Sequence, residues 1–221
     1  MEKIQTRDGS ETFVNPKFNE SYHSFTGAVE EATEKYCKPT KIAEIARERG
    51  EFTLLDFAFG MGYNSAMAIA IAKEANPDCK INVIGIENDP LIIEKIQEVN
   101  PKIPGYEFYK QLTPKNLCIK SEDNSITLKI LLGDAKDTIQ TIQSNTVDVV
   151  FYDSFSPKTQ PEMWSIFLFQ EVHRVLKQKG ILATYSCARL VRDNIKAAGL
   201  TYADGPKVGR RGPGTIVWKE N

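Results

Sequence analysis

The chain has 221 residues, of which 41% are hydrophobic and 26% charged, and its 28 basic and 29 acidic side chains give a formal net charge of −1. This composition is ordinary for a globular protein and excludes an overall basic character, although a local basic patch could still bind nucleic acid. No apolar run approaches the length of a membrane span, and the first residues lack the apolar core of a signal peptide, which predicts a cytoplasmic protein. The four scattered cysteines form no C-x-x-C pair, so we expect neither a disulfide framework nor a metal site.

The first 50 residues differ in pattern from the rest of the chain. Residues 8–24 have turn and hairpin character, and residues 25–49 are predicted to be helical with a break near Pro39. We therefore expect residues 1–50 to form a small hairpin and helical extension that packs on a domain of residues 51–221.

From Phe52 onward, strand and helix patterns alternate. The expected strands cover residues 52–59, 81–87, 126–132, 147–153, 181–185 and 215–218, with a short one near Thr201, and the expected helices cover residues 64–75, 91–99, 135–142, 161–176 and 188–198. We expect Gly180 to end the helix that starts at Pro161, and residues 100–124 to be an insertion or long loop. Such alternation predicts an α/β fold of the Rossmann-like kind, with a mainly parallel seven-stranded sheet and helices on both faces.

A glycine loop follows the first core strand. Gly60 and Gly62 stand where the next helix opens, and Glu87 ends the next strand, placed to accept hydrogen bonds from ribose hydroxyls. This pairing indicates a nucleoside-containing cofactor. A nicotinamide dinucleotide requires a third glycine where Ser65 stands, whereas S-adenosylmethionine has no phosphate and tolerates the looser loop, so the pattern favours S-adenosylmethionine.

The third strand also ends in an acid. In a nucleoside site, the Asp134 carboxylate is suited to accept a hydrogen bond from the adenine amino group, and the Ala135 N–H to donate to a ring nitrogen. The alternative is that Asp134 only caps the helix that starts there.

A third acid, Asp153, follows the apolar run 147–151 and precedes a Ser-Phe-Ser-Pro turn. A buried strand that ends in a carboxylate indicates a use for that charge, because desolvating an unpaired charge is costly. The alternative is a helix cap or a turn before Pro157. Because the first and fourth strands are neighbours in doubly wound sheets, we expect Asp153 to face the loop 60–62 across the ligand-binding crevice.

The segment 151–164, FYDSFSPKTQPEMW, resembles an element of the MnmC-type methyltransferases, which complete 5-methylaminomethyl-2-thiouridine at the wobble position of tRNA. Further matches follow in the family's order: Asp8-Gly9-Ser10 with Thr12, Glu20-Ser21-Tyr22-His23-Ser24, Gly60-x-Gly62-x-Asn64, Gly133-Asp134-Ala135 and Ala183-Thr184-Tyr185-Ser186. Ala58 departs from the family's first loop glycine, and the C-terminal 208–214 resembles the family's basic tail only loosely. The fused oxidase half of bifunctional members has no counterpart here.

The resemblance implies a class I S-adenosyl-L-methionine-dependent methyltransferase that acts alone, without FAD and without a metal, on an aminomethyl-uridine made by other enzymes. We expect Asp153 to be the catalytic carboxylate that meets the incoming amine. The expected cofactor contacts are Phe59, Gly60, Gly62, Asn64, Glu87, Asp134, Ala135 and Asp153. The expected contacts to the base are Tyr22, His23, Phe155 and Tyr185. The expected phosphate contacts to the anticodon stem-loop of tRNA are Lys158, Lys207, Arg210 and Arg211, with the loop lysines Lys110, Lys115 and Lys120 as a second possibility.

Two other functions fit part of the pattern. An aminopropyltransferase of the spermidine synthase kind, or another small-amine methyltransferase, also uses an acid at a strand end. The first would be expected to have a longer glycine run and a second acid three residues after Asp153, where this chain has Ser156. A non-catalytic nucleoside- or tRNA-binding subunit would have no need of the carboxylates of Glu87, Asp134 and Asp153.

Overall fold

The computed structural model describes residues 1–209 and 212–220. In this part of the chain, eight strands form one sheet in the order β10-β11-β9-β8-β4-β5-β7-β6, and three strands form a small sheet in the order β1-β2-β3. The large sheet consists of β4 (Glu51–Phe57), β5 (Lys80–Glu87), β6 (Cys118–Lys120), β7 (Ile126–Leu132), β8 (Val147–Tyr152), β9 (Leu176–Thr184), β10 (Leu200–Asp204) and β11 (Thr215–Lys219). The small sheet consists of β1 (Glu2–Gln5), β2 (Glu11–Asn15) and β3 (Glu20–Ser21).

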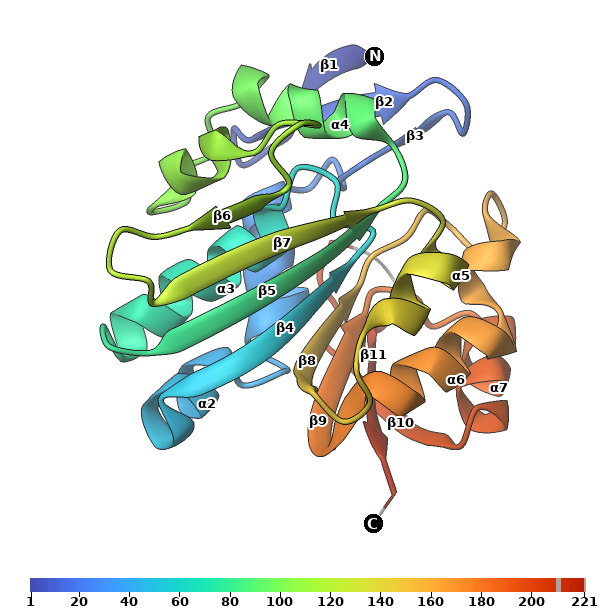
Figure 1. Ribbon diagram of the computed structural model, residues 1–221. Helices are drawn as coiled ribbons and strands as arrows, with labels where there is room; N and C mark the ends of the chain where they lie inside the picture. The colour runs from blue at the N-terminus through green and yellow to red at the C-terminus, as the bar shows by residue number, and fades with distance from the viewer. Residues whose placement is uncertain (210–211, 221) are drawn as a thin grey trace.

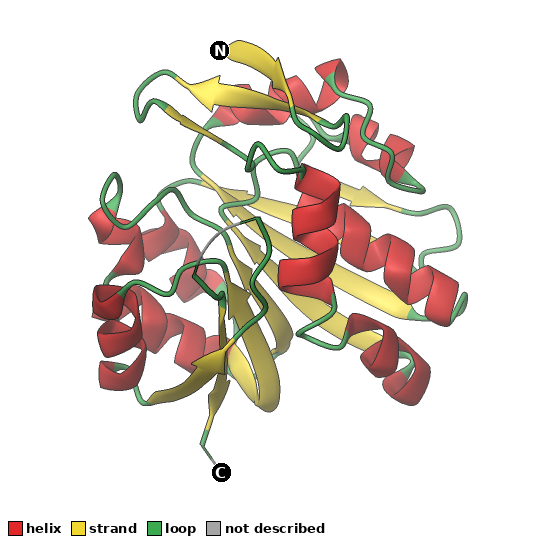
Figure 2. Ribbon diagram, turned by 180° about the vertical axis from the view of Figure 1, so that it is seen from behind, coloured by secondary structure: helices red, strands yellow, loops and turns green. Residues whose placement is uncertain are grey.

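Helices cover both faces of the large sheet (Figures 1 and 2). The α-helices are α1 (Ala28–Glu31), α2 (Ile42–Arg49), α3 (Tyr63–Ala75), α4 (Pro90–Lys95), α5 (Ala135–Thr138), α6 (Ile166–Val175) and α7 (Arg189–Ala197). A π-helical segment η1 (Ala32–Cys37) continues α1, and the 3₁₀ segments are η2 (Ile96–Glu98), η3 (Tyr106–Gln111), η4 (Ile139–Thr141) and η5 (Pro161–Trp164). No helix in the described part of the chain is long and apolar enough to cross a membrane.

The central strands bury alternate side chains on opposite faces of the sheet. In β4, Leu54 belongs to the core beneath α2 and α3, whereas Leu55 and Phe57 belong to the core beneath α5, α6 and α7. In β8, Phe151 lies on the first side and Tyr152 on the second. Both strands are hydrophobic on two faces because helices cover both, as expected for a parallel sheet inside an α/β domain.

The strand pairing confirms the predicted fold class and adds one strand. β4 pairs in parallel with both β5 and β8, so the first and fourth core strands are neighbours as predicted. The prediction of seven strands was wrong by one, because β6 from the expected loop 100–124 pairs antiparallel with β7. That segment also contains η3, whose buried Tyr106 and Tyr109 join the core. A three-residue strand is too short to show an alternating pattern, so local sequence does not reveal it.

The predicted end of the helix at Gly180 was also wrong. The helix α6 ends at Val175, and β9 starts at Leu176, so Gly180 lies inside a strand. The register between β8 and β9 shifts between the pairs Val147–Leu176 and Val149–Ile181. Residues 177–180 of β9 form a bulge there. A Cβ atom at residue 180 would lie 2.6 Å from the Leu176 side chain. Glycine is therefore required here for close packing and not for a left-handed helix end.

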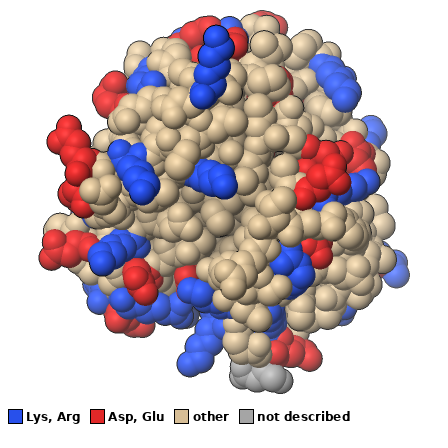
Figure 3. Space-filling view, in the orientation of Figure 1, with Lys and Arg blue, Asp and Glu red and all other residues tan. Residues whose placement is uncertain are grey.

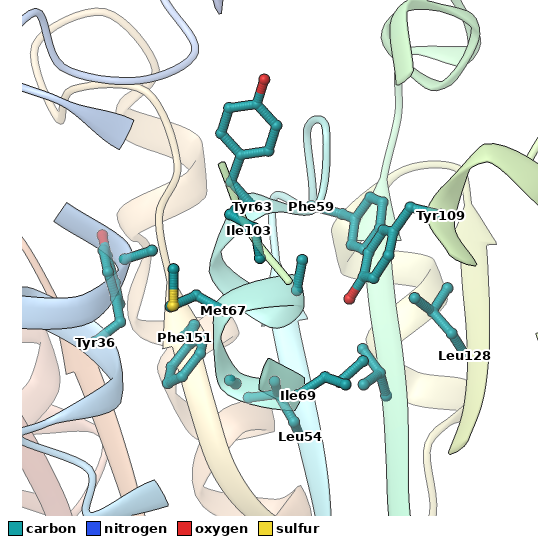
Figure 4. Close-up of a cluster of buried hydrophobic side chains, with 14 of the residues drawn as sticks. Tyr36, Leu54, Phe59, Tyr63, Met67, Ile69, Ile103, Tyr109, Leu128 and Phe151 are labelled. Carbon is teal, nitrogen blue, oxygen red and sulfur yellow. The ribbon is translucent and has the colours of Figure 1, made fainter. Parts of the chain in front are cut away.

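The N-terminal segment packs over the carboxyl ends of the central strands (Figure 1). The Tyr63 hydroxyl at the start of α3 donates to the Glu11 carbonyl at 2.8 Å. Tyr36 from η1 is buried in the same core as Leu54 and Phe151 (Figure 4). The predicted helical region is broken after Cys37, with Lys41 in a left-handed conformation before α2. We propose that residues 1–50 are an extension of a catalytic domain formed by residues 51–221.

Candidate active site

Two cavities meet at Asp153 above the carboxyl ends of β4, β5 and β8. The first, which we call the glycine-loop cavity, has a volume of about 210 Å³, and its lining includes Ala58, Phe59, Gly60, Asn64, Glu87, Asp134, Ala135, Asp153, Phe155 and Met163. The second, which we call the hairpin cavity, has a volume of about 430 Å³, and its lining includes Glu20, Tyr22, His23, Phe25, Glu31, Asp153, Ser154, Phe155 and Tyr185. Tyr22, His23, Asp153 and Phe155 line both.

Backbone conformation shapes the glycine loop between β4 and α3. Gly60 and Gly62 have φ angles of 56° and 74°, a left-handed region that favours glycine. A Cβ atom at residue 62 would lie 2.5 Å from the Phe59 ring, so a larger residue does not fit there. Ala58 also takes a positive φ, of 64°, although it has a side chain. The departure from glycine at this position therefore leaves the loop conformation in place but introduces local strain.

Glu87 fixes the loop from the end of β5. Its Oε2 accepts from the Gly60 N–H at 2.8 Å, and its Oε1 accepts from the Asn88 and Asp89 N–H groups at 2.8 and 2.9 Å. Burial raises the pKa of this carboxyl, and the three hydrogen bonds oppose that shift. Oε2 has one protein donor and so keeps a lone pair for a ligand in the glycine-loop cavity.

Asp134 and Ala135 line the glycine-loop cavity from the end of β7, the strand beside β5. The Asp134 side chain caps α5, since its Oδ1 accepts from the Lys136 N–H at 2.8 Å. The helix cap, the alternative to a ligand contact, is therefore present, and a ligand contact would have to come from the other oxygen atom.

The Phe59 side chain points away from the glycine-loop cavity. Its ring packs near Tyr109 in the core (Figure 4), so only its backbone is available to a ligand.

Asp153 is held from three sides at the end of β8. Its backbone N–H donates to the Phe57 carbonyl at 3.1 Å. Its Oδ1 accepts from the Tyr36 hydroxyl at 2.5 Å, and its Oδ2 accepts from the Asn64 side-chain amide at 2.8 Å. Burial and the nearby Glu31 carboxylate raise the pKa of Asp153 to about 6, although both hydrogen bonds favour the ionised form. Near neutral pH the carboxylate is therefore ionised and close to its titration point.

The charges around the glycine-loop cavity fit a cationic nucleoside cofactor better than a dinucleotide. Four acids (Glu87, Asp134, Asp153 and Glu162) and two lysines (Lys17 and Lys136) line it. The acids outnumber the lysines, so the lining attracts a sulfonium more than it attracts a pyrophosphate. The Asn64 Oδ1 atom is buried and has no hydrogen-bond partner in the described residues, which leaves an acceptor for an amino group of a ligand. In the described part of the chain, no cluster of three or more His, Cys, Asp or Glu side chains is arranged to hold a metal ion.

Aromatic side chains of the N-terminal extension cover the shared part of the two cavities. The Tyr22 hydroxyl accepts from the Asn15 side chain at 2.8 Å and donates to Asp89 at 3.1 Å, and its ring lies edge-on to Phe155 with centroids 5.1 Å apart. The buried His23 ring stacks on Tyr63, and burial lowers its pKa to about 4, so this histidine is neutral at pH 7.

The strand ends supply further aromatic groups. The Tyr185 hydroxyl donates to the Ser154 carbonyl at 3.0 Å, which fixes the ring at the hairpin cavity. Trp164 is fully buried, and its indole N–H donates to the Phe155 carbonyl at 2.8 Å. The structure thus brings the predicted base-binding aromatic residues together around one space.

Sequence reasoning missed three residues near Asp153. Tyr36 bonds the carboxylate directly, and Glu31 lines the hairpin cavity while forming a buried ion pair with Lys35. No motif marks them, and a Glu–Lys pair four residues apart is ordinarily a solvent-exposed feature of a helix. Asp56, also missed, is fully buried below the glycine loop, where burial raises its pKa to about 8.

The predicted phosphate-binding residues are less well placed than the cavity residues. Lys158 and Lys207 are exposed, and neither lines the two cavities. The predictions for Arg210 and Arg211 lie outside the described residues. In the 100–124 segment, Lys110 donates to backbone carbonyls of residues 97 and 99, which gives it a structural role. Basic and acidic side chains are interspersed over the face seen in Figure 3.

Comparisons with known proteins identify the family of the chain. A family model described as S-adenosyl-L-methionine-dependent methyltransferase matches residues 99–220. The crystal structure of MnmC2 from Aquifex aeolicus superimposes with a TM-score of 0.86 at 32% identity, covering 98% of this chain and 70% of that one.

Two curated proteins extend the comparison. An uncharacterized protein of Methanocaldococcus jannaschii is 30% identical over 98% of this chain and 59% of its own length. The tRNA 5-methylaminomethyl-2-thiouridine biosynthesis bifunctional protein MnmC of Methylibium petroleiphilum is 30% identical over 84% of this chain and 30% of its own length. The chain thus spans about three fifths of the first protein and less than a third of the second.

Proposed function

The chain belongs to the S-adenosyl-L-methionine-dependent methyltransferases, and from this premise we propose that it N-methylates the aminomethyl group of 5-aminomethyl-2-thiouridine at the wobble position of tRNA. The product is 5-methylaminomethyl-2-thiouridine. The observation that carries the proposal is the position of Asp153, which lines both the glycine-loop cavity and the aromatic hairpin cavity. The choice of tRNA is supported by the similar proteins named MnmC2 and MnmC.

The glycine-loop cavity is the proposed cofactor site. When bound, the cofactor supplies an electrophilic methyl group on a positively charged sulfur. Glu87 would accept hydrogen bonds from the ribose hydroxyls, Asp134 and the Ala135 N–H would hold the adenine, and Asn64 Oδ1 would accept from the amino group. The backbones of Phe59 and Gly60 line the site, and Gly62 gives the loop its turn without lining the cavity.

Asp153 is the proposed catalytic residue, because a carboxylate at the junction of the cavities can accept an N–H of the acceptor amine. Tyr36 and Asn64 occupy one position on each of its oxygen atoms and leave others open to the cavities. The attacking nitrogen must be neutral and gains positive charge during methyl transfer. A nearby carboxylate takes up its proton or stabilises that charge, and it orients the lone pair for an in-line reaction.

The hairpin cavity is the proposed site for the modified base. An RNA base that has left its stack is held between aromatic side chains, and Tyr22, Phe155 and Tyr185 supply them here. His23 is buried and neutral, so we assign it a packing role against Tyr63 at the wall of the site.

The anticodon stem-loop is the proposed partner outside the cavities. Lys158, Lys207, Arg210 and Arg211 are the proposed phosphate contacts, since phosphate binding requires basic side chains and the chain as a whole is nearly neutral. The enzymes that make the aminomethyl group would act earlier, and all steps would take place in the cytoplasm.

The position of Ser156 weighs against an aminopropyltransferase. An enzyme of the spermidine synthase kind is expected to have a second acid there, but the Ser156 N–H and hydroxyl both donate to Glu20, at 2.9 and 2.6 Å. This residue therefore ties the turn after β8 to the N-terminal hairpin.

One assay tests the proposal. The protein is incubated with methyl-labelled S-adenosylmethionine and tRNA that carries 5-aminomethyl-2-thiouridine, and the digested nucleosides are separated. We expect label in 5-methylaminomethyl-2-thiouridine, and none with tRNA that lacks the aminomethyl group. Transfer to putrescine from decarboxylated S-adenosylmethionine would instead indicate an aminopropyltransferase. Tight binding of cofactor and tRNA without any transfer would indicate a non-catalytic subunit.

A further inference from the structure

The helical segment formed by α1 and η1 carries two glutamate–lysine pairs with the same spacing and opposite environments. The pair Glu34–Lys38 lies at the surface, with side chains 37% and 63% exposed. The pair Glu31–Lys35 is buried, with side chains 8% and 2% exposed. Burying an ion pair contributes little to stability, because desolvation offsets the Coulomb attraction. The buried pair therefore indicates a use for the Glu31 carboxylate at that place.

The hairpin cavity supplies that use. Glu31 and Asp153 both line this cavity, so a ligand inside it meets both carboxylates. The Glu31 charge also helps to raise the pKa of Asp153. The Glu31 carboxylate is held by Lys35 at Oε1 and by the Ser24 N–H at Oε2, at 3.2 Å. As with Asp153, these partners leave other lone pairs on the oxygen atoms available to a ligand.

We propose that Glu31 is a second positioning residue for the acceptor amine and that it restricts the reaction to a primary amine and a single methyl transfer. This inference rests on the proposed function. A neutral primary amine has two N–H bonds and one lone pair. If Asp153 accepts one N–H and Glu31 the other, the lone pair is the only group left to face the methyl donor.

The same arrangement serves the reaction itself. The nitrogen lone pair forms the new N–C bond while the C–S bond of the donor breaks and its electron pair stays on sulfur. The nitrogen thereby gains a positive charge and keeps both N–H bonds, one toward Asp153 and one toward Glu31. The two carboxylates stabilise this charge, and the secondary ammonium product leaves or loses one proton to water.

A secondary amine does not satisfy this site. After one methylation, the neutral nitrogen has one N–H, so its new methyl group must lie against one of the two carboxylates when the lone pair faces the donor. A charged group left without its hydrogen bond is costly, and the loss of a hydrogen bond to a charged group corresponds to a rate difference of about tenfold to a hundredfold. The cavity thus favours the unmethylated acceptor.

The test compares two acceptors: tRNA that carries 5-aminomethyl-2-thiouridine and tRNA that carries 5-methylaminomethyl-2-thiouridine. Single-turnover rates and the ratio of monomethylated to dimethylated nucleoside are measured for the wild type and for Glu31→Gln, Glu31→Asp and the double variant Glu31→Gln/Lys35→Met. The double variant leaves no unpaired buried lysine, and thermal melts identify variants that fail to fold. Glu34→Gln is the matched control, because it removes the equivalent glutamate from the exposed pair.

We expect Glu31→Gln and the double variant to lower the preference for the primary amine by about tenfold or more, with dimethylated product appearing on long incubation. Glu31→Asp should restore part of the preference, and Glu34→Gln should match the wild type. An unchanged preference in a folded double variant would overturn the inference, even if the overall rate fell, because a purely structural role lowers both rates equally. If the wild type methylates neither tRNA, the proposed function fails; if it methylates both equally, only the inference about Glu31 fails.

Discussion

The glycine-loop cavity and the hairpin cavity share Asp153 but are built in different ways. The first is formed mainly by the ends of strands of one sheet, with Tyr22 and His23 at the part it shares with the second. Its loop is held by backbone groups, such as the Gly60 N–H on Glu87. The second is formed between the N-terminal hairpin and the turn after β8, and it is held by side chains, such as Glu20 on Ser156. In our proposal, a cofactor common to many enzymes thus meets a backbone scaffold, and the specific acceptor meets side chains that substitution can alter.

The largest expected effect tests the junction of the two cavities. Asp153→Asn keeps the size of the side chain and removes its charge, so it should lower the rate of methyl transfer by about 10² to 10⁴-fold. Cofactor affinity, measured by calorimetry, should fall far less than the rate, because Glu87 and the glycine loop are intact. An equal loss of affinity and rate would assign Asp153 to the cofactor site alone.

The same variant has an expected effect on stability. Asp153 has a pKa of about 6 in the folded protein and an ordinary value of 3.8, so the folded state binds more protons between these values. Its contribution to stability is complete below pH 3.8 and is lost as the pH rises through about 6. At pH 8 Asp153→Asn should therefore be more stable than the wild type, by up to about 3 kcal/mol, and this gain should vanish near pH 3. Denaturant unfolding at the two pH values measures it, and an equal difference at both would contradict the raised pKa.

The next effect tests the glycine-loop cavity by itself. Glu87→Gln should weaken cofactor binding by about 10 to 100-fold, because an amide replaces a carboxylate that accepts three backbone hydrogen bonds and faces the ribose in our proposal. The KM for tRNA should stay near the wild-type value. Glu94→Gln, an exposed acid on the following helix α4, is the control and should change neither quantity. A larger change in the KM for tRNA than in the affinity for the cofactor would contradict the separate roles of the two cavities.

The contrast between the cavities also explains what could be predicted from the sequence. Gly60, Gly62, Glu87 and Asp134 each lie at the end of a strand or within a few residues of it, so local pattern and the rules of parallel sheets are enough to predict that they lie together. Asp153 needed one further rule, the adjacency of the first and fourth strands, which the pairing of β4 with β8 confirms.

Local sequence patterns predict little of the hairpin cavity. Tyr36 contacts Asp153 across 117 positions of sequence, and the contact depends on how the N-terminal segment packs. Tyr22 and His23 were predicted only through the resemblance to a known family, since an isolated histidine gives no signal of its place. Long-range packing of side chains is a property of the folded chain, and no periodic pattern encodes it.

A smaller effect separates positioning from charge at Asp153. Tyr36→Phe removes one hydrogen bond that favours the ionised carboxylate, so the pKa of Asp153 should rise. In our proposal the ionised form of Asp153 is the active one. The transfer rate of the wild type should therefore increase with pH through about 6, and the midpoint in the variant should lie roughly one pH unit higher. At pH 9 the two proteins should have similar rates. A pH-independent loss in Tyr36→Phe would show that the hydroxyl orients the carboxylate without tuning its charge.

The smallest effect concerns strain in the glycine loop. Ala58 has a φ of 64° although it has a Cβ atom, a conformation that costs about 1 to 2 kcal/mol for a residue other than glycine. Glycine relieves this strain. It also raises the conformational entropy of the unfolded chain, which lowers the free energy of unfolding by about 0.4 to 1 kcal/mol. Ala58→Gly should therefore raise the free energy of unfolding slightly, by about 0.5 kcal/mol, and leave acceptor specificity unchanged. A destabilised variant would mean that packing of the alanine methyl group outweighs the strain. The shape of the glycine-loop cavity would then depend on a side chain as well as on the backbone. The two cavities would differ only in how much they depend on side chains.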